Sequence, residues 1–258
     1  MTTRSPQTIL ITGATGAIGS ALARTYAASG VRLILHGRNP DRLQDVRQAC
    51  ERLGAVVDCF TLLDVRFIEP LRTWVREVDR ATPLDLVIAN AGMNINIGAD
   101  GRGESWEAAD ALLDTNIRAT MVLVDAVLPG MRARRSGQIA LISSLAAYFG
   151  LPVTPSYCAS KAAVKAYGEA LRGWLAAEGI RVNVVMPGYV ESPMCRAMPG
   201  PKPFLLRPER AARLIRKGLE KNKARISFPF PLNLGTWALA VLPAHISQRI
   251  VRWAGYGG

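Results

Sequence analysis

Residues 8–19 read TILITGATGAIG, and this stretch sets the expectation for the fold. Its first five residues form an apolar, β-branched run that stops at Gly13, as a short buried strand does. An Ala-rich segment of helical composition begins at Ile18. Between the two, a glycine-rich turn lets the backbone approach a ligand closely, and the helix N-terminus offers unpaired N–H groups to an anion. The stretch therefore predicts a phosphate-binding turn between a strand and a helix.

Strands and helices alternate along the rest of the chain. We expect further strands at residues 31–35, 56–60, 84–88, 138–142, 181–185 and 224–228. Helices are expected at residues 18–29, 41–52, 68–80, 106–135 and 208–221, and around Tyr157. Because the strands are apolar runs rather than alternations, they are typical of a parallel sheet that helices cover on both faces. The predicted fold is α/β, with a single doubly wound, Rossmann-like parallel sheet.

Two local signals set expected helix ends. Asp41 is predicted to be the N-cap of the helix at 41–52, because its side chain can accept hydrogen bonds from first-turn N–H groups. Pro129-Gly130 is predicted to end the regular part of the helix at 106–135.

The length and composition fit one globular domain. The chain has 258 residues, 49% hydrophobic and 20% charged, and no linker-like run or internal repeat divides it. We expect a single dinucleotide-binding and catalytic domain over residues 1–258, with a core at 7–228 and an apolar C-terminal extension at 229–258. No two of the four cysteines have C-x-x-C spacing, and the two histidines lie far apart. We therefore predict no metal site and no disulfide framework.

The C-terminal part is basic and then apolar. The net charge is +12, and Lys and Arg are concentrated at residues 196–225. No aromatic platform or DNA-reading motif accompanies them, so nucleic acid is not favoured as a partner, and a solvated helix face is the simpler explanation. Residues 226–248 hold no formally charged residue, but Pro229, Pro231 and Pro243 oppose a spanning helix. Packing within or between subunits and contact with a membrane surface are the two alternatives for the extension.

The N-terminal apolar run is too short for a signal peptide. We therefore expect a cytoplasmic location. Membrane association through residues 229–258 is the alternative to be tested.

Tyr157 and Lys161 form the candidate catalytic pair. They are four residues apart within SYCASK, residues 156–161, and so lie on one face of the expected helix. A lysine ammonium placed there would lower the tyrosine pKa from its usual value of about 10, giving an acid or base that works near neutral pH. Tyr157 is the only one of six tyrosines with a lysine at this spacing. The alternative is a surface pair without a role.

The end of the second strand indicates which dinucleotide binds. An NAD site usually carries an acidic residue there, which holds the adenosine ribose. This sequence reads His36-Gly37-Arg38-Asn39, and the Arg38 guanidinium suits a 2′-phosphate. We therefore expect NADP(H) in preference to NAD(H).

As a set, these motifs resemble the short-chain dehydrogenase/reductase family, in its shorter branch, whose members have about this length. The resemblance covers roughly residues 7–228 and rests on the glycine turn, Asn90-Ala91-Gly92, Ser144 and the Tyr157/Lys161 pair. Four features depart from the pattern, among them Ala17 in place of a usual glycine and Ser192 in place of the usual threonine. The spacing of Gly13, Gly16 and Gly19 also occurs in the longer branch that contains epimerases, and Ala89 stands where an asparagine is common.

The resemblance implies four catalytic residues. Tyr157 would exchange a proton with the substrate oxygen, and Lys161 would lower the tyrosine pKa and hold the nicotinamide ribose. Ser144 would hydrogen-bond the substrate carbonyl, and Asn116 would support a water in a proton relay. Together with the glycine turn and Arg38, the resemblance gives the following expected cofactor contacts: Gly13, Thr15, Gly16, Ala17, Ile18, Gly19, Arg38, Asp64, Val65, Asn90, Ala91, Gly92, Tyr157, Lys161, Pro187, Gly188, Val190 and Ser192.

The predicted activity is hydride transfer between NADP(H) and a small carbonyl or alcohol substrate, with a homodimer or homotetramer as the expected assembly. The loops at 93–105 and 189–207 would select the substrate. Apolar residues such as Met194 and Phe204 in the second loop favour an apolar one. Two alternatives are a nicotinamide-binding regulator without catalysis and an epimerase or dehydratase that regenerates its bound nicotinamide.

Overall fold

The chain is described by a computed structural model that covers residues 5–28, 30–98 and 101–256. Its strands are β1 (Thr8–Ile11), β2 (Arg32–His36), β3 (Val56–Thr61), β4 (Leu86–Ala89), β5 (Gly137–Ile142), β6 (Ile180–Pro187) and β7 (Arg225–Phe228). Its helices are α1 (Ala17–Tyr26), α2 (Pro40–Arg52), α3 (Ile68–Ala81), α4 (Trp106–Leu113), α5 (Ala119–Ala133), α6 (Pro155–Leu175), α7 (Pro193–Ala197), α8 (Pro208–Glu220), α9 (Leu232–Val241) and α10 (Ala244–Val251). Short π or 3₁₀ turns are η1 (Asp114–Arg118), η2 (Leu145–Ala147), η3 (Ala176–Glu178) and η4 (Arg252–Tyr256).

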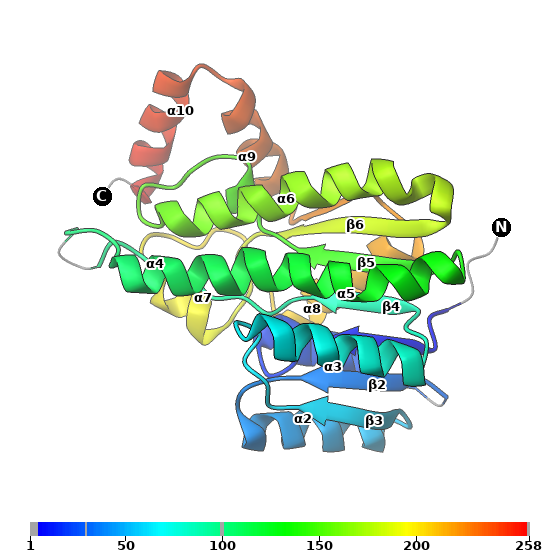
Figure 1. Cartoon of the computed structure of the whole chain (residues 1–258). Coiled ribbons are helices and arrows are strands. Elements are labelled where there is room, and N and C mark those ends of the chain that lie inside the picture. Colours follow the sequence, from blue (N-terminus) through cyan, green and yellow to red (C-terminus); the bar gives the residue numbers. More distant parts are fainter. Residues whose placement is uncertain (1–4, 29, 99–100, 257–258) are drawn as a thin grey trace.

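The strands form one sheet in the order β3-β2-β1-β4-β5-β6-β7 (Figure 1). Every neighbouring pair is parallel, so the C-terminal ends of the strands share one edge. β1 pairs with β2 on one side and with β4 on the other, and the strand order reverses at this point. Ligands of doubly wound sheets bind beyond such a reversal. The predicted Rossmann-like parallel sheet is confirmed.

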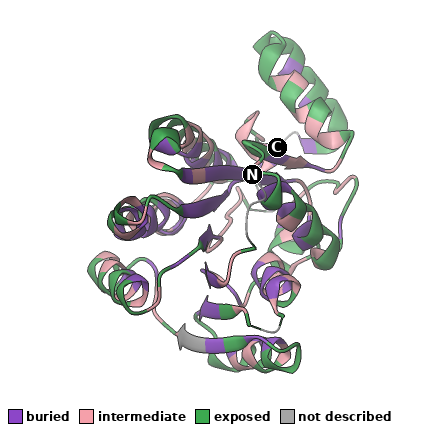
Figure 2. Cartoon of the chain, turned by 90° about the vertical axis from the view of Figure 1, so that its right-hand side faces the viewer, coloured by how far each residue is buried: buried purple, intermediate pink, exposed green. Residues whose placement is uncertain are grey.

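Alternate side chains of the strands pack on opposite faces of the sheet. In β1, Ile9 and Ile11 belong to one apolar core and Leu10 to the other, and all three are fully buried. Helices α1, α2 and α8 cover the first face, and α3, α5 and α6 cover the second (Figure 2). Each such buried side chain stabilises the fold by about 1.5–3 kcal/mol. Burial on both faces explains why the strands read as continuous apolar runs.

The N-terminus of α2 differs from the prediction. Asn39, not Asp41, is the N-cap, and its Oδ1 accepts a hydrogen bond of 2.8 Å from the backbone N–H of Arg42. Pro40 occupies the first helical position, where its missing N–H costs nothing. Asp41 therefore lies inside the first turn, where its charge favours the helix dipole.

Helix α5 continues beyond Pro129 and Gly130, so the predicted helix end is wrong. A Cβ atom added to Gly130 would lie 1.9 Å from Oδ2 of Asp79, on α3. Oδ1 of Asp79 accepts hydrogen bonds of 2.9 Å from the backbone N–H of Leu84 and from Nη2 of Arg134. Gly130 therefore serves the close packing of α3 against α5 rather than the end of a helix.

The C-terminal extension forms a hairpin of α9 and α10 that projects beyond the sheet (Figure 1). Leu232, at the start of α9, packs with Leu145. Val251 and Tyr256 pack with Met198, in the segment after β6. The hairpin therefore packs in part on its own chain. Within the described ranges, no helix is both long enough and apolar enough to cross a membrane.

We predict that Gly130→Ala destabilises the protein. Alanine is the better helix former by about 1 kcal/mol, but its Cβ would collide with the Asp79 carboxylate, and overpacking of this kind costs about 1–3 kcal/mol. Gly173→Ala in α6 is the matched control, because a Cβ there meets no atom within 4 Å, and it should be stabilising. Thermal unfolding followed by circular dichroism measures both. A midpoint for Gly130→Ala at or above that of the parent chain would contradict the packing argument.

Candidate active site

The turn after β1 has the geometry of an anion cradle. Gly13 has a φ of +67°, and a Cβ there would lie 2.9 Å from Cα of Ala91. A Cβ at Gly19 would lie 2.2 Å from the Gly13 carbonyl oxygen, so both positions require glycine. Gly16, the N-cap of α1, makes no side-chain hydrogen bond to the helix. The first-turn N–H groups can therefore bind a phosphate.

Asn90 joins this turn to the end of β4. Its Nδ2 donates hydrogen bonds of 3.0 Å to the carbonyl oxygens of Thr12 and Gly13. In return, Oγ1 of Thr12 accepts hydrogen bonds from the backbone N–H groups of Asn90 (3.0 Å) and Ala91 (3.1 Å). The structure thus places the predicted Asn90-Ala91-Gly92 segment beside the glycine turn.

His36 ties the glycine turn to the loop after β3, a role that the sequence analysis missed. Its Nδ1 accepts a hydrogen bond of 3.2 Å from the Gly13 N–H, and its Nε2 lies 2.6 Å from the Leu63 carbonyl oxygen. Because a carbonyl only accepts, Nε2 carries the proton and the ring is neutral. Burial lowers the His36 pKa from 6.5. No local signal could have shown this, since the partners are 23 and 27 residues away.

Arg38 and Asp64, two of the predicted cofactor contacts, come together at the ends of β2 and β3. Nη1 of Arg38 lies 3.8 Å from Oδ2 of Asp64, and the Arg38 side chain is 65% exposed. Arg66, which the sequence analysis did not single out, binds the same carboxylate, with Nη2 2.8 Å from Oδ2. Hydrogen bonds from Arg66 are the main cause of a lowered Asp64 pKa, and the charge of Arg38 lowers it further. Two guanidinium groups therefore stand where a 2′-phosphate was expected.

Three of the predicted catalytic residues come together at the start of α6. The Ser144 side chain stands close enough to that of Tyr157 to act on its pKa, and Oγ of Ser144 donates a hydrogen bond of 3.4 Å to the Pro187 carbonyl oxygen. Nζ of Lys161 lies 5.6 Å from the centre of the Tyr157 ring and donates a hydrogen bond of 3.0 Å to the Ile142 carbonyl oxygen. A Cβ at Gly92 would lie 3.4 Å from the same Nζ, which connects this group to the Asn90-Ala91-Gly92 segment.

The pKa of Tyr157 shifts in the direction opposite to the prediction. Burial raises it to about 12, although the Ser144 side chain acts to lower it. Burial also lowers the pKa of Lys161 to about 8. Both shifts have the same cause, because a low-dielectric site disfavours the charged form of either group. The expectation that Lys161 lowers the tyrosine pKa is therefore wrong for this arrangement.

Asn116 reaches the same region from η1 and is only 1% exposed. Its Nδ2 donates to the Met93 carbonyl oxygen (3.0 Å) and to Oγ of Ser160 (2.9 Å), and its Oδ1 accepts from the Met93 N–H (2.9 Å). Ser160 in turn donates a hydrogen bond of 2.8 Å to the Tyr157 carbonyl oxygen. The π turn, a feature often found at functional sites, thus connects the loop after β4 to the backbone of Tyr157.

The predicted segment after β6 is anchored on both sides. The Gly188 N–H donates a hydrogen bond of 2.8 Å to the carbonyl oxygen of Phe228, and Val190 forms an isolated bridge with Leu206. Oγ of Ser192 caps α7 by accepting a hydrogen bond of 3.0 Å from the Cys195 N–H. Contact of this segment with a carboxamide stays a prediction.

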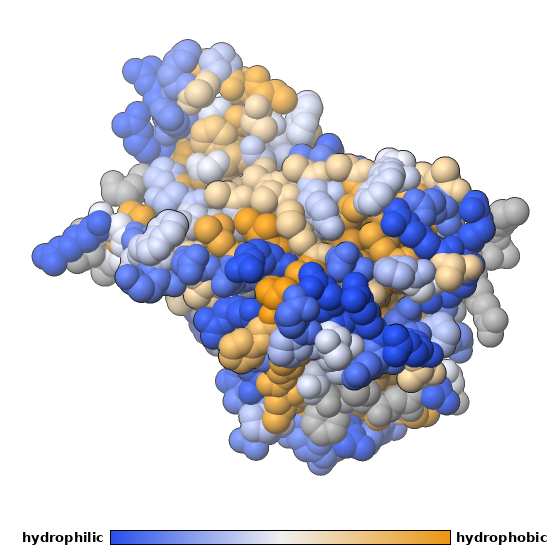
Figure 3. All heavy atoms as spheres, in the orientation of Figure 1, coloured by the Kyte–Doolittle hydropathy of each residue, from blue (hydrophilic) through white to orange (hydrophobic). Residues whose placement is uncertain are grey.

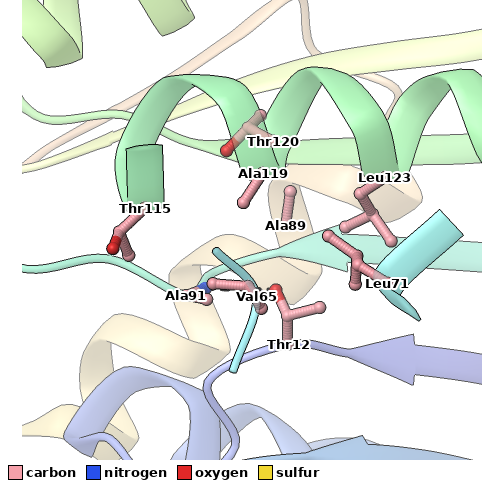
Figure 4. A pocket seen from close by; sticks show the side chains of 9 residues that line it. All are labelled: Thr12, Val65, Leu71, Ala89, Ala91, Thr115, Ala119, Thr120 and Leu123. Atoms are coloured by element: carbon pink, nitrogen blue, oxygen red, sulfur yellow. Dashed lines mark hydrogen bonds between the residues drawn. The ribbon is translucent and has the colours of Figure 1, made fainter. Parts of the chain in front are cut away.

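A small cavity adjoins the predicted cofactor contacts Val65 and Ala91 (Figure 4). Its lining includes Ala89, Ala91, Val65 and Thr120, and it encloses about 10 Å³, roughly the space of one water. Ala89 lines the cavity at the position where the resembling family often has asparagine. The cavity is too small for a dinucleotide or a substrate, so the site is defined by the residues at the edge of the sheet.

Comparison with known proteins agrees with this geometry. The family model described as short chain dehydrogenase matches residues 7–200. An "Uncharacterized oxidoreductase" of Myxococcus xanthus is 36% identical over 244 residues, which are 94% of this chain and 95% of that protein.

Solved structures share the fold. A short-chain dehydrogenase from Sphingobium yanoikuyae in complex with NADPH has a TM-score of 0.79 and 23% identity, with 95% of each chain covered. The bulky-bulky ketone specific alcohol dehydrogenase from Comamonas testosteroni has a TM-score of 0.78 and 23% identity, covering 97% of this chain and 95% of that one. At this identity, the two structures support the fold alone.

We predict that His36 makes the stability of the protein depend on pH. Because its folded-state pKa is below 6.5, the unfolded chain takes up the proton at higher pH. The contribution of His36 is therefore complete above about pH 6.5 and is lost as the pH falls through the lowered pKa. Among the charges that act on the ring, Asp64 raises this pKa and Arg38 lowers it.

Urea unfolding between about pH 5 and pH 7 tests this role. His36→Asn keeps an acceptor for the Gly13 N–H but does not titrate, so the loss of unfolding free energy toward low pH should become smaller. His245→Asn, at an exposed position in α10, is the matched control and should leave the dependence unchanged. Identical pH dependence in His36→Asn and the parent chain would show that His36 does not carry the effect.

Proposed function

The chain belongs to the short-chain dehydrogenase family of oxidoreductases, and from this we propose that it is an NADP(H)-dependent enzyme that interconverts a carbonyl and an alcohol. The observation that carries the proposal is the meeting of Ser144, Tyr157 and Lys161 at the edge of the sheet that also carries the glycine turn. A proton donor, a second hydrogen-bond donor and a cation beside a dinucleotide cradle are the groups that this reaction needs.

Tyr157 is the proposed acid and base. Its raised pKa keeps the phenol protonated at neutral pH, which is the form that donates a proton to a carbonyl oxygen. Ser144, whose side chain acts on the Tyr157 phenol, is the proposed second donor to that oxygen. A donor aimed at a developing oxyanion stabilises it by about 2.7–4 kcal/mol.

Lys161 is proposed to restore the proton on Tyr157, and Asn116 to hold the pair in place. With a pKa of about 8, Lys161 is largely protonated at pH 7, so its ammonium can serve as the source of the proton that returns to Tyr157. Asn116 holds Ser160, and through it the first turn of α6, against the loop that begins at Met93. In this proposal, loss of Asn116 misplaces the pair rather than removing a reacting group.

The residues at the β1–β4 reversal fit a dinucleotide, and NADP(H) is the proposed one. The glycine turn and the N-terminus of α1, without a side-chain cap, suit the pyrophosphate. Arg38 and Arg66 place two guanidinium groups beside Asp64, which favours a 2′-phosphate. When bound, the nicotinamide supplies or accepts the hydride. The Sphingobium structure in complex with NADPH supports this assignment by its fold.

We propose an apolar carbonyl compound as the substrate. The segment after β6 exposes Met194, Phe204 and Leu205, which are 43%, 53% and 47% exposed. Met198 in the same segment is buried against the tail. The segment is therefore anchored at one point, while at others it exposes apolar side chains that a ligand could contact. The ketone specificity named for the Comamonas structure is compatible with this class of substrate.

We predict that Tyr157→Phe lowers turnover by at least about 10²-fold, because the substrate oxygen loses its proton donor, while NADPH still binds. A panel of steroids, 3-oxoacyl thioesters, sugars and small ketones, followed by NADPH absorbance, first identifies a substrate. Tyr167→Phe, in the same helix, is the matched control and should keep its activity. Undiminished turnover in Tyr157→Phe would overturn the mechanism, and turnover without net NADPH consumption would instead indicate an epimerase or dehydratase.

We predict that Arg38→Gln weakens NADPH binding by about 10-fold or more, the loss expected for a charge-assisted hydrogen bond worth about 1.5–3 kcal/mol. NADH binding should change little, because NADH has no 2′-phosphate. Fluorescence titration with each cofactor gives the ratio of the dissociation constants for NADPH and NADH. Arg80→Gln, an exposed position at the end of α3, serves as the control. An equal loss for both cofactors would refute the assignment of Arg38 to the 2′-phosphate.

A further inference from the structure

The α9–α10 hairpin exposes an apolar stripe on each of its helices. The side chains of Trp237, Val241 and Trp253 are 46%, 62% and 90% exposed. The exposed apolar positions follow a spacing of three and four residues, which places them on one side of each helix: Leu234, Trp237 and Val241 on α9, and Ile246, Ile250 and Trp253 on α10 and η4. Figure 3 shows apolar and polar side chains next to each other on this projecting part of the molecule. A soluble monomer rarely exposes so large a continuous apolar surface, and a surface of this kind marks an interaction site.

The opposite side of the hairpin is fixed to the body of the protein. Val251, Ser247 and Tyr256 are buried, and Oγ of Ser247 donates a hydrogen bond of 2.8 Å to the Leu239 carbonyl oxygen, which joins α10 to α9. The hydroxyl of Tyr256 lies 2.6 Å from that of Tyr189, in the segment after β6. These contacts hold the hairpin in one orientation, in which the apolar stripes of both helices stay exposed.

The charges around the stripes are of one sign. No Asp or Glu occurs after Glu220, whereas Arg249 and Arg252 stand next to Ile250 and Trp253 in the sequence and are exposed. A second copy of the chain on the same surface, paired by a two-fold axis, would bring like charges together, which is unfavourable. A surface of anionic lipid headgroups instead complements the arginines, and exposed tryptophans suit the boundary between headgroups and acyl chains.

We propose that the exposed face of the α9–α10 hairpin docks the protein on the surface of a membrane that contains anionic phospholipid. The helices lie on the surface with their apolar stripes inserted at the boundary of the acyl chains. Because Tyr256 contacts Tyr189 and Met198, docking places the segment after β6 close to the lipid. If the proposed function holds, this arrangement suits an apolar substrate that partitions into the membrane.

Co-sedimentation of the full-length chain with vesicles tests docking without any need for turnover. Vesicles of phosphatidylcholine with phosphatidylglycerol should bind the protein, and vesicles of phosphatidylcholine alone should bind it at least about 10-fold more weakly. Arg249→Gln with Arg252→Gln should weaken binding to the anionic vesicles by about 30-fold, since each basic residue near such a surface contributes about 1 kcal/mol. Arg24→Gln with Arg80→Gln, both exposed and outside the hairpin, should bind like the parent chain.

The apolar stripes are tested by a triple variant, Val241→Ser, Ile250→Ser and Trp253→Ser, which should lose vesicle binding by at least about 10-fold. Its control is Leu53→Ser with Trp106→Ser, which changes equally exposed apolar residues on other elements. Circular dichroism of each variant confirms that it is folded. Failure of the parent chain to bind anionic vesicles would overturn the proposal. So would a triple variant that binds normally, or one whose only change is a smaller assembly in analytical ultracentrifugation, because the stripes would then bind a second copy.

Discussion

The site depends on one junction, the hydrogen bonds by which Asn90 and Thr12 join the ends of β1 and β4. The backbones after these strands approach so closely that a Cβ at Gly13 would lie 2.9 Å from Ala91. Only glycine readily adopts the positive φ of this position and also leaves room for Ala91. The junction lies where the strand order reverses, so the same contact that closes the core also shapes the cradle for a phosphate. His36 completes it from the neighbouring strand.

A second constraint acts on α6, the helix that carries the proposed acid and base. Its first turn is held by a chain of buried hydrogen bonds from Asn116 through Ser160 to the Tyr157 backbone, and Oγ of Ser143 donates a hydrogen bond of 2.7 Å to the Lys161 carbonyl oxygen. Buried polar networks of this kind are stable only when every member is satisfied. The reacting side chains therefore stand on a rigid element, and the variable loops around them are left to select the substrate.

Burial decides the electrostatics of this group. Tyr157 and Lys161 are held in a site where desolvation opposes charge on both, so the tyrosine pKa rises while the lysine pKa falls. Nζ of Lys161 lies 5.6 Å from the centre of the Tyr157 ring. Burial also lowers the pKa of His36, and its neutral ring accepts one hydrogen bond and donates another. The charged side chains instead lie at exposed positions, on Arg38, Arg66 and the C-terminal hairpin.

The sequence by itself determined the doubly wound sheet, the glycine turn and the pairing of Tyr157 with Lys161. These features depend on local patterns: apolar runs, glycines between a strand and a helix, and a spacing of four residues within one helix. Pro129-Gly130 shows the limit of such patterns, because a local stop signal was overruled by the close approach of Asp79 from another helix.

Only the tertiary structure decided the roles of His36 and Arg66, the direction of the Tyr157 pKa shift and the orientation of the C-terminal hairpin. Hydrogen-bond partners of His36 come from residues far away in the chain. A pKa depends on how much water the fold removes from a group, which no spacing reveals. In the hairpin, the sequence showed an uncharged, apolar segment, but only contact with Met198 and Tyr189 determined which residues face inward and which stay exposed.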